Sequence, residues 1–168
     1  MKRILFGLFA MIAVAAVVSS CTKTVNNTDT SMQAYSDNFT INSNGWIAEG
    51  LGYYHGLEMN DMIDVNTLKA DAVVVYISLD GGRNYQALNT TLLDETHNRY
   101  VAYSYTHGVD AGNTYNVVLF AENVDGTQTA LPPTLTVKIV VIPARLIANT
   151  DVNLKDYNAV KATFNLKD

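Results

Sequence analysis

The chain has 168 residues, of which 11 are Lys or Arg and 16 are Asp or Glu, so its formal net charge is -5. This length suits about one domain. The acidic balance and the lack of any basic run disfavour nucleic-acid binding, which needs clustered Lys and Arg. Hydrophobic residues make up 48% of the chain, which is enough for a core and excludes wholesale disorder.

The first 20 residues have the pattern of a secretory signal peptide. Met1, Lys2 and Arg3 form a basic start, and an apolar run follows over residues 4–18. This run is too short for a comfortable transmembrane helix, which needs about 20 apolar residues. Small residues follow it, as at a cleavage site. We therefore expect residues 1–20 to be removed; the alternative, a buried hydrophobic helix, does not account for the basic start.

The end of this segment, Val18, Ser19, Ser20 and Cys21, resembles the lipobox of bacterial lipoproteins. The resemblance implies that the Cys21 thiol receives a diacylglyceryl group, that cleavage occurs before Cys21, and that the new amino group is acylated, for example with palmitate. Two acyl chains give stable anchoring, at about 0.8 kcal/mol per buried CH₂. Cys21 is the only cysteine, so no disulfide is expected. The expected location is the cell envelope, anchored to the outer membrane and facing either the periplasm or the outside.

Residues 21–33 are expected to form a lipid-anchored flexible tether, because they are polar, rich in Thr and Asn, and without periodicity. The removed segment contains Lys2 and Arg3 and no acidic residue, so the mature chain carries nine basic and 16 acidic residues. Such a surface is not attracted to anionic headgroups. The lipid is therefore the expected attachment to the membrane.

Short apolar segments separated by turn residues begin at residue 34. Two strands are expected around Asn42–Gly45, because Asn-Gly is a strong hairpin signal. A third strand is expected over residues 52–59, where the odd-numbered side chains share one face. The segment 60–71 is less regular and favours a short helical turn.

The segment 72–79, AVVVYISL, is almost wholly apolar and predicts a central strand covered on both faces. Further strands are expected over residues 85–90, 99–106, 113–124 and 135–142, with turns at residues 80–84 and 125–126 and a stop at Pro143. The strand spacing is typical of a β-sandwich or barrel. We expect a mainly β domain over residues 34–146, a single antiparallel β-sandwich of an immunoglobulin-like or related type.

The C-terminal segment, residues 147–168, is expected to contain a short amphipathic helix. Its apolar face consists of Leu154, Tyr157, Val160 and Phe164. Asn153 is the expected N-cap, and Lys155 and Lys161 are expected to point to water. The helix is predicted to cover an edge or end of the sandwich. Docking on a partner or membrane is the alternative, disfavoured because the helix is short and not basic.

The chain from Asp71 to Asp168 resembles a group of small uncharacterised lipoproteins of Bacteroidota-type bacteria. The segments that carry the resemblance are ADAVVVYISLDGG, YVAYSYTHG, VKIVVIPARL and DYNAVKATFNL. It implies a Trp-bearing strand, with Trp46 as that Trp, followed by two characteristic strands and a terminal helix. It carries over no active site, because none is established for that group.

Five aromatic residues are candidates for ligand binding: Trp46, Tyr53, Tyr54, Tyr103 and Tyr105. Exposed aromatic side chains on a sheet could stack on sugar rings or peptides. Tyrosines also suit half-buried strand positions without any ligand role. The aromatic set supports the alternative function, a glycan-binding accessory module.

No compact metal motif is formed by His55, His97 and His107, because their spacing is too wide. The segment 94–97, DETH, combines two carboxylates and an imidazole that could serve acid–base chemistry, but a polar loop is the simpler interpretation. The segment 79–84, LDGGRN, resembles a calcium loop only loosely, and a hairpin turn is favoured.

We therefore assign no catalytic residue and expect no metal or cofactor. The leading hypothesis is a non-enzymatic lipoprotein of the envelope that binds a ligand or forms part of an envelope assembly. Its expected partners are the membrane, through the N-terminal lipid, and a protein or glycan that the sequence does not identify.

Overall fold

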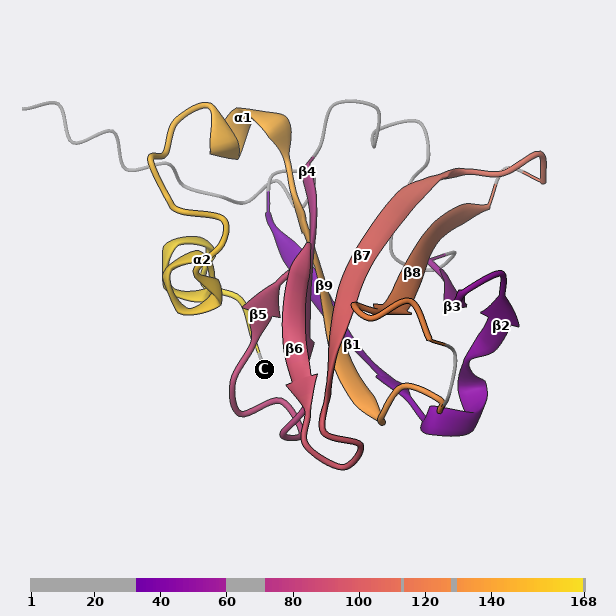
Figure 1. Ribbon diagram of the computed structural model, residues 1–168. Coiled ribbons are helices and arrows are strands. Elements are labelled where there is room, and N and C mark those ends of the chain that lie inside the picture. The colour runs from indigo at the N-terminus through magenta and orange to yellow at the C-terminus, as the bar shows by residue number, and fades with distance from the viewer. Residues whose placement is uncertain (1–32, 60–71, 113, 128–129, 168) are drawn as a thin grey trace, which may run out of the picture.

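The computed structural model describes residues 33–59, 72–112, 114–127 and 130–167. Two antiparallel sheets pack face to face, and two helices lie on the outer side of the first sheet (Figure 1). The prediction of a mainly β sandwich with a C-terminal helix is confirmed. The signal segment, the tether up to residue 32 and the expected helical turn at 60–71 lie outside the described residues.

The first sheet has the strand order β1-β9-β4-β5. Its strands are β1 (Tyr35–Ile41), β9 (Leu135–Ile142), β4 (Ala72–Ser78) and β5 (Gln86–Ala87). Two strands, β9 and β4, have almost continuous apolar runs because both of their faces are buried. The central, doubly covered strand expected at residues 72–79 is therefore confirmed.

The second sheet has the order β2-β3-β8-β7-β6. Its strands are β2 (Ile47–Glu49), β3 (Gly52–Glu58), β8 (Tyr115–Asn123), β7 (Arg99–Val109) and β6 (Thr90–Asp94). One face is buried and the other meets solvent, so buried and more exposed residues alternate along β8. The expected face of the third segment is confirmed, since Tyr53, Leu57 and Met59 are all buried.

The prediction of a hairpin at Asn42–Gly45 is wrong. These residues include the short 3-10 helix η2 (Ser43–Gly45), which carries the chain from β1 in the first sheet to β2 in the second. Gly45 does not adopt the positive φ that a two-residue Asn-Gly hairpin needs. The flanking Ile41 and Trp46 are both buried between the sheets, and this burial separates the two strands.

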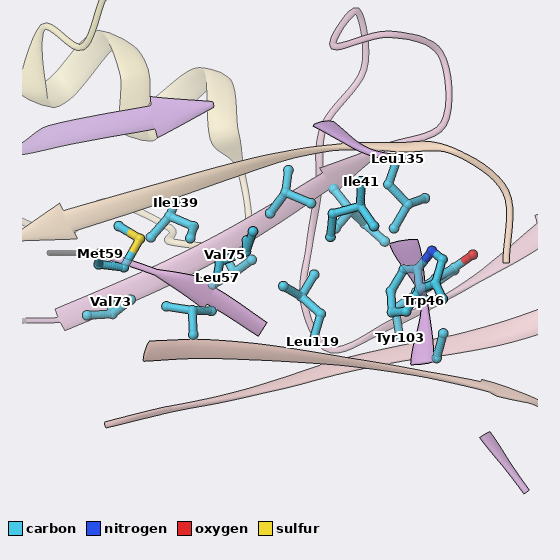
Figure 2. Packing of buried hydrophobic residues seen from close by; sticks show 14 of the residues in the cluster. Ile41, Trp46, Leu57, Met59, Val73, Val75, Tyr103, Leu119, Leu135 and Ile139 are labelled. Atoms are coloured by element: carbon cyan, nitrogen blue, oxygen red, sulfur yellow. The ribbon is translucent and has the colours of Figure 1, made fainter. Parts of the chain in front are cut away.

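The main core fills the space between the sheets (Figure 2). Val75, Leu119 and Ile139 are fully buried there, and burying each such side chain contributes about 1.5–3 kcal/mol. Trp46 and Tyr103 lie together at one end of this core (Figure 2), with ring centroids 6.4 Å apart.

A second core lies between the outer face of the first sheet and the helices α1 (Ala144–Ile147) and α2 (Tyr157–Phe164). The sheet contributes Val74, Tyr76 and Val140, and α2 contributes Tyr157 and Val160. The C-terminal helix was expected at an edge or end of the sandwich, but it covers a face, because the outer side of this sheet is itself apolar. No helix in the described ranges is long and apolar enough to cross a bilayer.

The N-cap of α2 is Asp156, whose carboxylate accepts a hydrogen bond from the Ala159 N–H at 3.1 Å. The expected cap, Asn153, instead accepts from the Lys155 N–H at 3.1 Å, in a turn before the helix. The helix ends at Phe164, and its C-cap Asn165 adopts the left-handed conformation with φ of 52°.

The two ends of the described fold lie side by side. Gln33 and Ala34, just before β1, line a hollow together with Phe164 and Lys167 at the end of α2. From there β1 runs to Ile41, at the opposite end of the first sheet.

Candidate functional site

A cleft of about 380 Å³ lies between the β4–β5 turn and the start of α2. Residues 82–86 form one wall, and residues 155–158 with Lys161 form the other. The walls meet because α2 packs across the first sheet beside its edge strand β5 (Figure 1), where the rings of Tyr85 and Tyr157 are 4.7 Å apart. Segments far apart in the sequence therefore form one site.

The β4–β5 turn is ordered around Asp80. Its carboxylate accepts hydrogen bonds from the Ser78 hydroxyl at 2.5 Å and from the Asn84 N–H at 2.9 Å. These bonds, the one from Ser78 first, hold the pKa of Asp80 well below its usual range. Gly81 and Gly82 take positive φ values of 72° and 88°, which the turn requires. The hairpin expected here is confirmed, since β4 and β5 pair antiparallel.

The lining of the cleft is cationic although the domain is acidic. Arg83, Lys155 and Lys161 line it, against one acidic residue, Asp156. The Asp156 carboxylate already caps the helix. In a chain with 11 basic and 16 acidic residues, this cluster makes a local positive region that attracts anions.

A buried lysine, Lys138 of β9, lies beside the tyrosines of this cleft. It is only 1% exposed, and its Nζ donates a hydrogen bond to the Tyr157 hydroxyl at 2.8 Å. Nζ also lies 5.5 Å from the centre of the Tyr85 ring, within range for a cation–π contact. Nζ lies 5.1 Å from the centre of the Tyr157 ring because it is bonded to the hydroxyl of that residue.

Three tyrosines enclose this lysine. The rings of Tyr76 and Tyr157 are 5.2 Å apart, and Tyr85 completes the group. The Tyr76 hydroxyl donates to the Leu154 carbonyl at 2.7 Å. Burial is the main cause that raises the pKa of Tyr76, so its hydroxyl stays protonated and continues to donate. The sheet side of the cleft is therefore a hydrogen-bonded aromatic layer that holds a cation.

Sequence reasoning did not assign this site. One residue could have pointed to it. Lys138 is a charged residue within the apolar run LTVKIVVI, and a strand with such a run can be buried on both faces. Lys155 and Lys161 were expected to point to water. Lys155 is exposed and Lys161 half-buried, but both line the cleft.

The predicted aromatic set does not form a surface. Trp46, Tyr53 and Tyr103 are buried in the core between the sheets, so they do not belong to an exposed platform. Tyr105 is half-buried, and its hydroxyl donates a hydrogen bond to the Val73 carbonyl oxygen at 2.9 Å. Tyr54 is half-buried in β3. The alternating positions of the strands place most of this set inward.

The three histidines have separate partners. His55 Nδ1 lies 2.7 Å from the Gly45 carbonyl oxygen, and His107 Nδ1 lies 2.5 Å from the Tyr115 hydroxyl. His97 contacts Asp94. Within the described ranges, no group of three or more His, Cys, Asp or Glu side chains is placed to hold a metal ion. Cys21 and the preceding residues Val18, Ser19 and Ser20 lie outside those ranges.

The segment 94–97 forms a bonded corner. The Asp94 side chain is 2% exposed, and its Oδ2 accepts from His97 Nδ1 at 2.8 Å and from Arg99 Nε at 3.1 Å. Arg99 also donates to the Leu131 carbonyl at 2.9 Å. Burial alone would raise the pKa of Asp94, but the bonds from His97 and Arg99 outweigh it and lower the pKa. Both donors are thus engaged in linking β6, β7 and the segment before β9.

A smaller pocket of about 290 Å³ borders this corner and is lined by Asp94 and Glu95. His97 is not among its described lining residues. The three residues that could have served acid–base chemistry therefore do not all line one pocket: Asp94 and Glu95 line it, and His97 is bonded to Asp94.

The cleft beside α2 is the strongest candidate site, because it alone of these features combines an ordered wall, a cationic lining and a buried cation. Comparisons with protein-family models, curated proteins and solved structures found no match for the chain. The assignment therefore depends on the geometry and chemistry of the residues themselves.

Proposed function

We propose that the protein is a lipid-anchored component of the cell envelope, attached to the outer membrane through Cys21, whose β-domain binds a small ligand without chemical conversion. The observation that carries the binding role is the cleft beside α2, where Arg83, Lys155 and Lys161 gather in an acidic domain. The residues Val18 to Cys21 support the anchor through their lipobox pattern.

The groups in the cleft are suited to recognition. Exposed Gln86 and Asn158 offer amides that both donate and accept hydrogen bonds. The cations offer charge-assisted hydrogen bonds. A volume of about 380 Å³ falls in the range of small-molecule sites.

The alternative, a glycan-binding module that uses Trp46, Tyr53, Tyr54, Tyr103 and Tyr105, loses its main support, because three of these side chains are in the core. A partly exposed aromatic ring lies elsewhere. Half-buried Tyr85 lines the cleft, and Tyr157 beside it is only 7% exposed. Sugar recognition therefore remains compatible with the proposal, but at a different place.

The anchor is tested by Cys21→Ala. We expect the variant to leave the membrane fraction, or to accumulate unprocessed, and to lose labelling by acyl-chain precursors, because the lipid is the attachment. Ser20→Ala keeps a small residue before the cysteine and is the matched control. Unchanged fractionation and labelling of Cys21→Ala would rule out the lipoprotein assignment.

The binding role is tested by thermal unfolding of the full-length protein, purified from membranes in detergent, against anionic, neutral and cationic small molecules. A ligand that binds only the folded state raises the midpoint. We expect at least one compound to do so for the wild type and not for the double variant Arg83→Gln, Lys155→Gln. Lys167→Gln, outside the cleft, is the control. A panel without any such compound would contradict the proposal.

A further inference from the structure

We infer that the ligand of the cleft is a sugar that carries a negative charge, such as a uronic acid or a sugar phosphate. This inference rests on the proposed binding role of the same cleft. It names the chemistry that the residues select: an anion for the cations, and hydroxyl groups for the amides and tyrosines.

The anionic part follows from the charge of Lys155, which no described ion pair compensates. The ion pairs within the described part of the chain join Asp94 to His97 and Arg99. None reaches the ammonium group of Lys155, which is exposed at the mouth of the cleft. A carboxylate or phosphate group bound there would supply the missing counter-charge.

The buried Lys138 strengthens this argument. Burying a charge without an opposite charge destabilises a protein, and the described ion pairs do not include Lys138. Methionine would fill a similar volume beside the aromatic rings at no electrostatic cost. Lys138 is not among the described lining residues, so an anionic ligand would meet its charge through Tyr157, which binds Lys138 and lines the cleft.

Tyr157 links this cation to the cleft. Its hydroxyl accepts the Lys138 hydrogen bond, and an ammonium group cannot accept one in return. The proton of the Tyr157 hydroxyl is therefore left for another acceptor, and none of the described residues accepts it. Tyr157 also lines the cleft. An oxygen atom of the ligand would be the acceptor.

The sugar part follows from the remaining lining. Gln86 and Asn158 are exposed amides that match vicinal hydroxyl groups. The half-buried ring of Tyr85 adds an aromatic surface beside them, and such a ring offers an apolar body with a polar tip. Most of the lining residues are polar or charged, which disfavours an acyl chain or another apolar ligand.

The test uses four probes on the full-length protein in detergent: glucuronate, glucose 6-phosphate, glucose and inorganic phosphate. By isothermal titration we expect glucuronate or glucose 6-phosphate to bind at least about tenfold more tightly than glucose, since one charge-assisted contact is worth about that factor. We expect them also to bind more tightly than phosphate, which lacks the sugar hydroxyl groups. The tighter of the two charged sugars identifies a carboxylate or a phosphate as the source of the charge.

Five variants, of which Lys167→Gln is the control, assign the effect to the cleft. Arg83→Gln and Lys155→Gln should each weaken the charged sugar about fivefold or more, whereas Lys167→Gln should not. Tyr157→Phe alone would leave the buried Lys138 ammonium without its acceptor, so it is combined with Lys138→Met. The double variant should weaken binding without a loss of thermal stability that would indicate misfolding. Lys138→Met should do the same, because methionine fills the buried space.

The outcomes separate the two proposals. Glucose binding as tightly as the charged sugars, or cleft variants that bind normally, would overturn this inference. Phosphate binding as tightly as glucose 6-phosphate would overturn its sugar part. Binding of other panel compounds at the cleft, with none of the charged sugars, would leave the proposed function standing and this inference wrong. No binding by any compound would overturn both.

Discussion

Asp94 and Lys138 are both buried charged side chains, but only Asp94 has a described partner of opposite charge. Asp94 is compensated by His97 and Arg99, so its charge is part of the scaffold. Lys138 has a phenol hydroxyl and aromatic rings around it and no described ion pair. The first residue is therefore expected to matter for stability, and the second for binding.

Asp94→Asn should lower the free energy of unfolding by about 2 kcal/mol at pH 7, because hydrogen bonds to a charged group are worth about 1.5–3 kcal/mol. The pKa of Asp94 is lowered in the folded state. Its contribution is therefore present above the unfolded pKa, about 4, and is lost as the pH falls through the lower folded pKa. Urea titrations at pH 7 and pH 3 should show a large wild-type advantage at pH 7 and a small one at pH 3.

The control is Glu95→Gln, next in sequence and exposed. It should leave the urea midpoint nearly unchanged at both pH values. Other carboxyl groups with lowered pKa, including Asp80 and Asp110, affect wild type and variant alike, so the difference between the two proteins isolates Asp94. Equal midpoints at pH 7 would show that the corner does not stabilise the fold.

At the scale of the element, α2 is stabilised by its packing against the first sheet. Eight residues are too few for a stable isolated helix. Burial of Tyr157 and Val160 against the first sheet holds it in place. The sequence predicted the helix correctly because this apolar spacing is local, but it misplaced the N-cap, since Asn153 and Asp156 are both good capping residues and only packing distinguishes them.

Asp156→Ala should therefore destabilise the protein by about 1 kcal/mol through loss of the cap. Asp156→Asn should cost little, because asparagine caps almost as well. Asn153→Ala, at the position expected from sequence, should cost less than Asp156→Ala. Chemical denaturation of the three variants gives the order, and the reverse order for Asn153 and Asp156 would place the helix start three residues earlier.

At the scale of the whole molecule, most strands could be predicted because alternation and apolar runs are local signals, but β6 was not expected from the sequence. The assignment of strands to sheets could not be predicted, as the Asn42–Gly45 segment shows. A short link can join two strands of one hairpin or carry the chain from one sheet to the other. The burial of Ile41 and Trp46 between the sheets favours the second arrangement. The cleft could not be predicted from the sequence for the same reason, since Arg83 and Lys161 line one site only after α2 packs against the first sheet.

The three-layer arrangement predicts where the fold is most resistant to opening. β4 and β9 are covered by the second sheet on one side and by the helices on the other, so their amides should exchange with solvent only on global unfolding. Hydrogen exchange followed by NMR should find Val75 and Ile139 among the slowest amides and Ala48, on the exposed edge strand β2, among the fast ones. Faster exchange in β9 than in β2 would contradict this.

The hollow shared by the start of β1 and the end of α2 gives an anchored domain a near side and a far side. In a chain held at Cys21, the tether reaches the fold at Gln33, beside Lys167. The opposite end carries η2 and the Asp94–Arg99 turn, which Arg99 joins to Leu131. If the chain is anchored at Cys21, an epitope fused after the last residue would lie on the side where the tether joins the fold, and one inserted in that turn would lie on the opposite side.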